Sequence, residues 1–287
     1  MLAVLPSQVL IGLINGAFYA LLSLGMAIIF GLLNVINFAQ GAFYMMGAFA
    51  AWMLLHYLGV PYWAALVIAP LVVAALGMAV ERLLLASLYR VDHIYGWLVT
   101  YGVALMAEAV FRVFYGVSGK PYAPPASLHG AVDLGFMVLP AYRAWVILVS
   151  SALCLAVWLA IERTRLGSYL RAAVEKPELV QAFGINVPRL LTLTYGLGVG
   201  LAALAGVLAA PIYQVTPLMG SQIIVVVFAV VVIGGLGSIL GTIVTGFALG
   251  VIQGITKAFY PEAANLVIFV IMAAVLLAAP AGLFGRR

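Results

Sequence analysis

Charged residues are scarce in this sequence of 287 residues: they make up only 7% of it, while hydrophobic residues make up 67%. A soluble domain carries about 25% charged residues, so the composition excludes a protein whose main solvent is water. Apolar runs of about 20 residues recur along the chain, which is the length needed to cross a hydrocarbon core of ~30 Å. These runs are too long and too uniformly apolar for the alternating strands of a barrel. The sequence therefore predicts an all-α, polytopic transmembrane helical bundle.

Residues that hold disulfides, metals or nucleotides are also nearly absent. The single cysteine, Cys154, excludes an intrachain disulfide and a cysteine-based metal site. His56, His93 and His129 are scattered near the ends of expected helices, and we predict no metal site. No phosphate loop of the form G-x-x-x-x-G-K-S/T occurs, so we expect a chain that is not an enzyme and binds no cofactor of its own. No basic residue precedes the first apolar run, so we expect a permanent first span rather than a cleaved signal peptide.

Nine apolar segments follow one another, and eight of them are long enough to be full spans. The eight are residues 8–30, 41–58, 62–80, 94–116, 143–161, 190–212, 239–257 and 263–281. The ninth, residues 221–235, has an apolar core of about 13 residues, which is short for a span and closer to a broken or re-entrant segment. We expect nine spans if this segment crosses and eight if it dips and returns. In either case residues 1–287 are expected to form a single transmembrane domain.

Basic residues predict the orientation of the chain, because loops rich in Lys and Arg stay in the cytoplasm. With nine alternating spans, one side receives Arg82, Arg90, Arg163, Arg165, Arg171, Lys176, Arg189, Arg286 and Arg287. The other side receives only Lys120, Arg143 and Lys257. This asymmetry favours nine spans, with the C-terminus and the polar loop at about 162–189 in the cytoplasm. The N-terminus and the Gly- and Pro-rich loop at about 117–142 are then expected outside.

Glycines recur near one face of one expected helix in the C-terminal part of the chain. They fall at Gly237, Gly241, Gly246, Gly250 and Gly254, and further pairs are Gly12 with Gly16 and Gly196 with Gly200. Small residues let helix backbones approach closely in lipid, where packing drives association. Close packing within the chain is one interpretation. A subunit interface or the lining of a narrow pathway is the other, and the sequence leaves both open.

Two segments interrupt the apolar pattern, one in each half of the chain. "NVINFAQGAFYMMGA", residues 34–48, places three amides at three-residue spacing, and "IGGLGSILG", residues 233–241, has too many glycines for a continuous helix. Broken backbone at membrane depth needs a cover of protein or a watery cavity, and paired interruptions point to a substrate path. The candidates for that path are Asn34, Asn37, Gln40, Gly234, Gly235 and Gly237. Helix capping is the alternative interpretation of the three amides.

Glu108 and Arg112 are the only charges expected well inside a span. Ionisable groups at membrane depth are functional candidates, but these two are four residues apart on one helix and can pair with each other. We interpret them as a structural ion pair, with a substrate site as the alternative. A proton-coupled carrier needs a relay of buried acids or histidines, and one acid already matched with a base does not supply it.

The most polar stretch, "RAAVEKPELVQAFGINVP", residues 171–188, predicts two short helices joined at Pro177. Ser168 is placed as the N-cap of the first helix, which should end at Lys176 because a residue before proline avoids the α region. Pro177 suits the first turn of the second helix, and Gly184 suits its end in the left-handed conformation. The product is a compact projection with an apolar patch. We interpret it as the contact for a protein partner, because its acidic side chains are poorly suited to an anionic leaflet.

The same stretch resembles the cytoplasmic loop by which ABC-importer permeases dock on their ATPase subunit, with its E-A-A…G…P pattern. Glu175 is followed by Lys-Pro in place of Ala-Ala, which is typical of the branched-chain amino acid permease family. Other stretches resemble that family too: "LINGAFYALLSLGMAIIFGLLNVINFAQGAFYMMGA", "ERTRLGSYLRA" and "GGLGSILGTIVTGFALGVIQ". The resemblance covers almost the whole chain and is specific to the LivH-type permease subunits.

The resemblance implies a permease subunit of an ATP-driven importer for branched-chain or other hydrophobic amino acids, in the bacterial cytoplasmic (inner) membrane. It implies four kinds of partner: a second homologous permease subunit, two cytoplasmic ABC ATPase subunits that bind ATP and Mg, a periplasmic amino-acid-binding protein, and the lipid bilayer. No nucleic acid is expected. The residues implied in ATPase coupling are Arg171, Glu175, Glu178, Phe183 and Gly184.

Other functions stay open at this point. An ABC permease for urea or another small solute is the alternative within the same class. A stand-alone secondary carrier or channel predicts transport by this chain alone, independent of ATP. A membrane scaffold that transports nothing predicts that changes in the glycine faces alter assembly while no solute moves.

Overall fold

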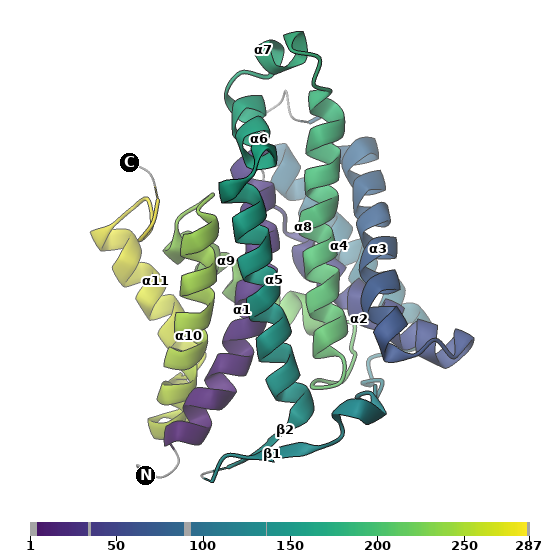
Figure 1. The fold of residues 1–287 in the computed structure, drawn as a ribbon, viewed down its shortest axis with the longest axis vertical. Helices are drawn as coiled ribbons and strands as arrows, with labels where there is room; N and C mark the ends of the chain where they lie inside the picture. The colour runs from purple at the N-terminus through teal and green to yellow at the C-terminus, as the bar shows by residue number, and fades with distance from the viewer. Residues whose placement is uncertain (1–4, 34–35, 89–92, 136, 286–287) are drawn as a thin grey trace.

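In the computed structural model, which describes residues 5–33, 36–88, 93–135 and 137–285, the chain is a bundle of helices with one small hairpin (Figure 1). The elements in chain order are α1 (Leu5–Leu33), α2 (Ala39–Leu58), α3 (Tyr62–Val80), the π-helical turn η2 (Glu81–Leu85), α4 (His93–Tyr115), η3 (Ala126–Leu128), β1 (Ala131–Asp133), β2 (Val138–Pro140), α5 (Ala141–Arg163), α6 (Arg165–Glu175), α7 (Pro177–Ala182), α8 (Val187–Ala209), α9 (Met219–Gly234), α10 (Ile239–Phe259), η4 (Pro261–Ala263) and α11 (Leu266–Ala278). Seven of the described helices are long and apolar enough to cross a membrane: α1, α2, α3 with η2, α4, α5, α8 and α10. The predicted all-α fold class is confirmed.

The two remaining apolar helices are shorter than the roughly 20 residues of a full span. α9 has 16 residues and occupies the segment 221–235, which the sequence marks as short. The span predicted over 263–281 is too long, because α11 has only 13 residues. It ends before Pro280 because proline forces an extended conformation on its predecessor, and Ala279 has φ −141° and ψ 85°.

The two ends of the bundle carry different elements (Figure 1). Figure 1 shows α1 rising from the end that carries the N-terminus and the β1–β2 hairpin, while α6 and α7 stand at the opposite end. α8 returns from that end through the middle of the molecule, where it packs against α1, α2 and α3. Since α1 and α8 are buried over most of their length, the core of the bundle is built on these two helices.

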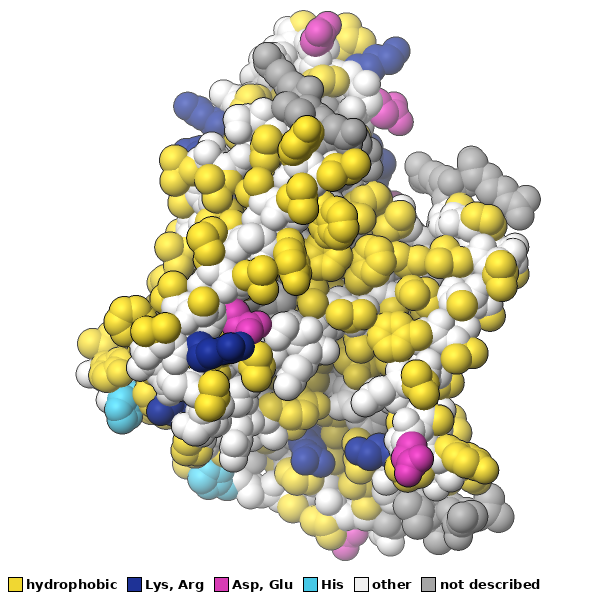
Figure 2. All heavy atoms as spheres, turned by 180° about the vertical axis from the view of Figure 1, so that it is seen from behind, with side chains coloured by type: hydrophobic (Ala, Val, Ile, Leu, Met, Phe, Trp, Pro, Cys, Tyr) yellow, Lys and Arg dark blue, Asp and Glu magenta, His cyan; other side chains and the backbone are white. Residues whose placement is uncertain are grey.

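The surface of the bundle is suited to lipid. Figure 2, which views the molecule from behind, shows hydrophobic side chains across the middle of this face and most charged ones toward its two ends. α3 and α4 expose many large apolar side chains, among them Leu71, Met106 and Val113. A patch of this extent on a soluble protein would mark a contact or aggregation surface, whereas in a bilayer it meets hydrocarbon.

α2 begins halfway through the bundle and not at its end. Gln40, in its first turn, donates from Nε2 to the carbonyl oxygen of Gly198 at 3.0 Å, in the middle of α8. Gly25 of α1 lies against this hydrogen bond, since a Cβ on Gly25 would be 2.5 Å from both Nε2 of Gln40 and the carbonyl oxygen of Gly198. Gly25 precedes the end of α1 by eight residues (33 − 25), or about 12 Å of helix. The chain therefore folds back into the bundle after α1.

Side chains satisfy the backbone that folds back. Thr100 of α4 accepts a hydrogen bond from the amide of Phe38 at 3.2 Å, and its hydroxyl lies 3.3 Å from the carbonyl oxygen of Ile36. Asn37 Oδ1 accepts from the amide of Ala39 at 3.1 Å. An unsatisfied backbone group in the hydrocarbon region costs several kcal/mol, so non-helical backbone is tolerated there only with such partners.

α1 and α10 pack against each other along glycines. A Cβ on Gly12 would lie 2.5 Å from the carbonyl oxygen of Gly250, and a Cβ on Gly246 would lie 2.6 Å from the backbone of Ala20. Gly254 lies against the same stretch of α1. The glycine face of α10 therefore packs within the chain, which is the first of the two interpretations that the sequence leaves open.

The Gly- and Pro-rich loop between α4 and α5 is packed onto the helices at one end of the bundle. Its strands β1 and β2 pair antiparallel. Lys120 exchanges backbone hydrogen bonds of 2.9 and 3.0 Å with Val215, ahead of α9. Burial raises the pKa of the Tyr122 phenol to about 12, with a further increase from the neighbouring Tyr62. The loop thus closes this end as a surface element.

Gly246→Ala is expected to destabilise the protein. Overpacking costs about 1–3 kcal/mol, which exceeds the gain of about 1 kcal/mol that alanine brings to a helix. The midpoint of thermal unfolding in detergent micelles measures the effect. Gly102→Ala in α4 is the matched control, because no atom lies within 4 Å of its new Cβ. Equal midpoints for the two variants would contradict the glycine packing between α1 and α10.

Candidate functional site

α6 and α7 together form a polar projection at one end of the bundle (Figure 1). Lys176 separates the two helices with φ −141° and ψ 71°, and Pro177 opens α7, so the predicted break at this proline is confirmed. Gly184 has φ +83°, the left-handed conformation predicted for it. The predicted N-cap Ser168 is wrong. α6 already begins after Thr164, whose extended backbone separates it from α5, and Ser168 lies inside α6.

The projection exposes two aromatic rings, Tyr169 on α6 and the more exposed Phe183 at the end of α7. Phe183 is 84% exposed, while Val180 beneath it is buried in a small core with side chains of α6 and α8. Glu175 and Glu178 are exposed as well. An aromatic ring held in water by a supported helix pair is suited to a protein contact, because aromatic anchors carry a large share of interface energy.

Arg171 ties the projection to the bundle. Its Nη1 lies 3.7 Å from Oε2 of Glu162, near the end of α5, and both side chains are partly exposed. A pair of this kind contributes about 0–1 kcal/mol, so it orients α6 more than it stabilises the fold. The pair borders a cavity of about 540 Å³, which Gly31 and Gly237 also line. The structure thus brings Arg171 and Gly237, predicted for two different roles, to one cavity.

The amides predicted to line a path are enclosed by packing. Asn37 and Gln40 are fully buried, and Asn37 Nδ2 donates to Gln40 Oε1 at 3.4 Å. Asn37 also binds the amide of Ala39 in the first turn of α2, which agrees with the capping interpretation. Asn34 lies outside the described residues. A role of these amides in translocation stays a prediction.

The glycine-rich turn after α9 has the broken backbone that its sequence predicts. Gly235 and Gly237 have φ values of +101° and +83°, and a Cβ on Gly234 would lie 2.8 Å from the backbone of α10. The C-terminal segment covers the end of α9, since the amide of Leu283 donates to the carbonyl oxygen of Ile233 at 2.9 Å. Helix ends leave carbonyl groups without partners, and this contact satisfies one of them. A role of the turn in the path stays a prediction.

One buried charge lies just beyond the apolar run of α3. Glu81 is only 2% exposed, and Thr192 of α8 donates to its Oε2 at 2.7 Å. The expectation that Glu108 and Arg112 are the only charges well inside a span is therefore wrong. The reason is that η2 continues α3 through Leu85, beyond the apolar run, so Glu81 falls within the span. The sequence does contain a sign of this buried charge, because Glu81 directly follows the apolar run that ends at Val80.

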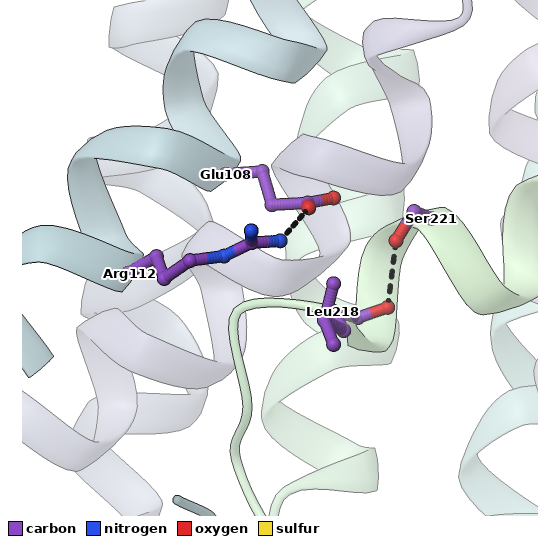
Figure 3. A network of polar contacts seen from close by, with 4 residues as sticks. All are labelled: Glu108, Arg112, Leu218 and Ser221. Atoms are coloured by element: carbon purple, nitrogen blue, oxygen red, sulfur yellow. Dashed lines mark hydrogen bonds and ion pairs between the residues drawn. The ribbon is translucent and has the colours of Figure 1, made fainter. Parts of the chain in front are cut away.

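The expected ion pair between Glu108 and Arg112 is present on α4. Arg112 Nη2 lies 2.6 Å from Glu108 Oε1, and the side chains are 47% and 17% exposed respectively. Figure 3 shows the Glu108 side chain extending from α4 toward the start of α9, where Ser221 lies. The Ser221 hydroxyl donates to the carbonyl oxygen of Leu218 at 3.0 Å. A cavity of about 220 Å³ lies between these two helices, and Glu108 and Ser221 both line it.

A third cavity, also of about 540 Å³, lies on the other face of α9. Its described lining includes neutral polar side chains and no charged one. Two of them are held in place, since Tyr213 donates to Asn15 Oδ1 at 2.8 Å and Tyr19 donates to Gln253 Oε1 at 2.9 Å. The first turns of α9 therefore separate a cavity that contains a carboxylate from a cavity lined by hydroxyls and amides.

These features define a multi-pass membrane protein with broken helices in its interior and a polar projection at one end. The chain belongs to the family described as "Branched-chain amino acid transport system / permease component", whose model matches residues 8–276. It is thus the permease component of an ABC transport system, a transport subunit and not itself an ATPase.

Named relatives are similar over nearly the whole chain. The high-affinity branched-chain amino acid transport system permease protein LivH of Escherichia coli is 28% identical, over 97% of this chain and 95% of that protein. The corresponding permease protein BraD of Pseudomonas aeruginosa is 30% identical with the same coverage. A probable LivH protein of Methanocaldococcus jannaschii is 27% identical over 92% of this chain and 88% of that protein.

Gln40→Leu is expected to lower the free energy of unfolding by about 1–3 kcal/mol, because the buried partners of this amide lose their hydrogen bonds. Gln222→Leu is the matched control: Gln222 is exposed, and surface substitutions usually change stability by less than about 0.5 kcal/mol. Thermal unfolding in micelles compares the two. A Gln40→Leu protein that unfolds at the control's temperature would show that the amide does not hold the start of α2.

Proposed function

We propose that this chain is the membrane permease subunit of an ATP-driven importer of branched-chain amino acids, and that its polar projection contacts the ATPase subunit. The observation that carries the second part is Phe183, an exposed ring on a projection with its own small core. The first part is supported by full-length similarity to proteins named for high-affinity branched-chain amino acid transport.

The connections of the projection suit the transmission of movement. A short turn, residues 183–186, joins α7 to α8, whose start is capped because Asn186 Oδ1 accepts from the amide of Arg189 at 3.1 Å. α8 packs against α1, α2 and α3, and Arg171 links α6 to Glu162 at the end of α5. In the proposal, ATPase subunits that close on ATP move the projection. The membrane subunits then switch from inward-open to outward-open.

Each coupling residue has a distinct part in this proposal. Phe183 fills a cleft of the ATPase subunit, and Gly184 ends α7 so that the ring is presented outward. Glu175 and Glu178 meet basic residues around the cleft, which their exposure supports. Arg171 stays bound to Glu162 and fixes the angle of α6.

The proposed assembly contains a second homologous permease subunit, two cytoplasmic ABC ATPase subunits that carry ATP and Mg, and a periplasmic binding protein that delivers the amino acid. It sits in the bacterial inner membrane, with the projection and the C-terminus in the cytoplasm. Charge supports this orientation, because loops rich in basic residues stay in the cytoplasm. The described basic residues in and beside the projection are Arg82, Arg163, Arg165, Arg171, Lys176 and Arg189.

Phe183→Ala is expected to weaken binding of the ATPase subunit about tenfold or more, because the loss of an aromatic anchor at an interface costs at least about 1–2 kcal/mol. ATP-dependent leucine uptake should fall with it. Vesicles that contain this chain, its partner permease, the ATPase subunits and the binding protein allow both to be measured. Leu277→Ala is the matched control, because Leu277 is an apolar side chain, 88% exposed, on α11.

Two results would count against the proposal. Normal uptake and normal ATPase binding by Phe183→Ala would remove the projection from the coupling contact. Leucine uptake by the unaltered chain without ATP would instead favour a stand-alone carrier.

A further inference from the structure

The cavity of about 220 Å³ between α4 and the start of α9 has the start of α2 as its back wall. Beside it α2 and α9 touch backbone to backbone, since a Cβ on Gly41 would lie 2.5 Å from the carbonyl oxygen of Gly220. An apolar cavity of about 150 Å³ is enough to hold benzene. The present cavity therefore has room for a branched aliphatic side chain, which is smaller than benzene, together with a small polar head group.

The lining of this cavity is apolar on most sides and charged at one point. Phe38 and Met45 of the α2 region, Leu105 of α4 and Ile224 of α9 form the apolar walls. Glu108 is the charged residue among the described residues that line it. Small-molecule sites share this design, in which apolar walls surround a few polar groups that fix orientation.

The polar groups at the cavity retain capacity for a ligand. Arg112 binds Glu108 through Oε1, and a carboxylate accepts hydrogen bonds at both oxygens. Ser221 donates its hydroxyl proton to Leu218, so the lone pairs of its oxygen remain available as acceptors. Glu108 and Ser221 come from different helices and face each other across the gap (Figure 3). Two acceptors on opposite walls suit a cationic group placed between them.

We propose that this cavity binds the amino acid in transit and that Glu108 receives its ammonium group, an inference that rests on the proposed function. The ammonium group lies between Glu108 and Ser221, and the branched side chain packs against the apolar walls. The carboxylate of the amino acid faces the first turn of α9, which is the positive end of the dipole of that helix. Arg112 balances the charge of Glu108 when the cavity is empty, so that no bare charge stands at membrane depth.

This arrangement discriminates between classes of solute. Urea and sugars carry no positive charge for the carboxylate, and they are too polar for the walls. A site built to bind a particular polar group rejects solutes that lack it, because its own groups are then left without partners. The cavity on the other face of α9, with hydroxyls and amides, lacks such a charge.

The test removes both charges with the double variant Glu108→Gln and Arg112→Gln, whose amides still form hydrogen bonds. The complete assembly in vesicles gives three readings: subunit assembly, ATP hydrolysis stimulated by leucine-loaded binding protein, and leucine uptake. Assembly and stimulated hydrolysis are expected to stay unchanged. The leucine moved per ATP should fall about tenfold or more, which is the effect of losing a hydrogen bond to a charged group.

A second pair of variants tests the cavity itself. Leu105→Trp and Met106→Trp change adjacent side chains of α4 that are 49% and 61% exposed, and of these two only Leu105 lines the cavity. Leu105→Trp is expected to lower the leucine moved per ATP by filling the cavity. Met106→Trp is expected to leave it unchanged.

The measurements distinguish failure of the proposed binding site from failure of the proposed function. Unchanged uptake per ATP in the double variant and in Leu105→Trp overturns the site. If the double variant does not assemble, the ion pair is a structural contact, and equal uptake by the two tryptophan variants then overturns the site as well. Unaltered assemblies that move no leucine would overturn the proposed function itself, and the site with it.

Discussion

The interior of this protein depends on hydrogen bonds to a short piece of non-helical backbone after α1. Thr100 and Asn37 bind the amides of Phe38 and Ala39, and Gln40 binds the middle of α8. Without these contacts the bilayer would favour a continuous helix, because only helices satisfy their own backbone there. With them, α2 can begin inside the bundle, where its start meets the start of α9. The cavity that contains Glu108 exists only because both helices begin at that level.

The bundle divides into a rigid part and a part with free volume. α1 and α10 meet backbone to backbone at glycines, and Tyr19 of α1 donates to Gln253 of α10, so their contact is closely packed. α4 packs against α2 but is separated from α9 by one cavity, and α6 is separated from the turn after α9 by another. Switching proteins move between discrete packings of their elements. In this chain such alternatives are available beside α4 and α6 and not along the α1–α10 contact.

The parts of the fold that local signals determine could be predicted from the sequence. Apolar runs gave the helices, Pro177 gave the break in the projection, and the four-residue spacing of Glu108 and Arg112 gave their ion pair. The sequence predicted helix boundaries wrongly where a neighbouring element determines them. The apolar run that ends at Val80 predicts Glu81 outside the membrane, but a π-helical turn extends the helix beyond this run. Ser168 has the residue type of a helix cap, but α6 begins at Arg165, after the extended backbone of Thr164 where α5 ends.

The candidate site was less predictable for a related reason. Phe38, Glu108 and Ser221 are far apart in the chain, and no spacing indicates that they line one cavity. The sequence did show that Glu108 is an unusual residue at that depth, but pairing with Arg112 explained it fully. No pattern in the sequence indicates that the chain folds back after α1, and this fold-back brings the start of α2 to α9. That contact joins segments about 180 residues apart, as Gly41 and Gly220 show (220 − 41).

The cover over the end of α9 has a consequence for biosynthesis. The amides of Leu283 and Phe284 bind the carbonyl oxygens of Ile233 and Gly234, which precede them by 50 residues (283 − 233). At ~5–20 residues per second, a ribosome needs roughly 3–10 s to cover that distance. For those seconds α9 is already made while the groups that complete its end are not. The glycine-rich turn beside the projection therefore reaches its final form late, after the helices that surround it have been synthesised.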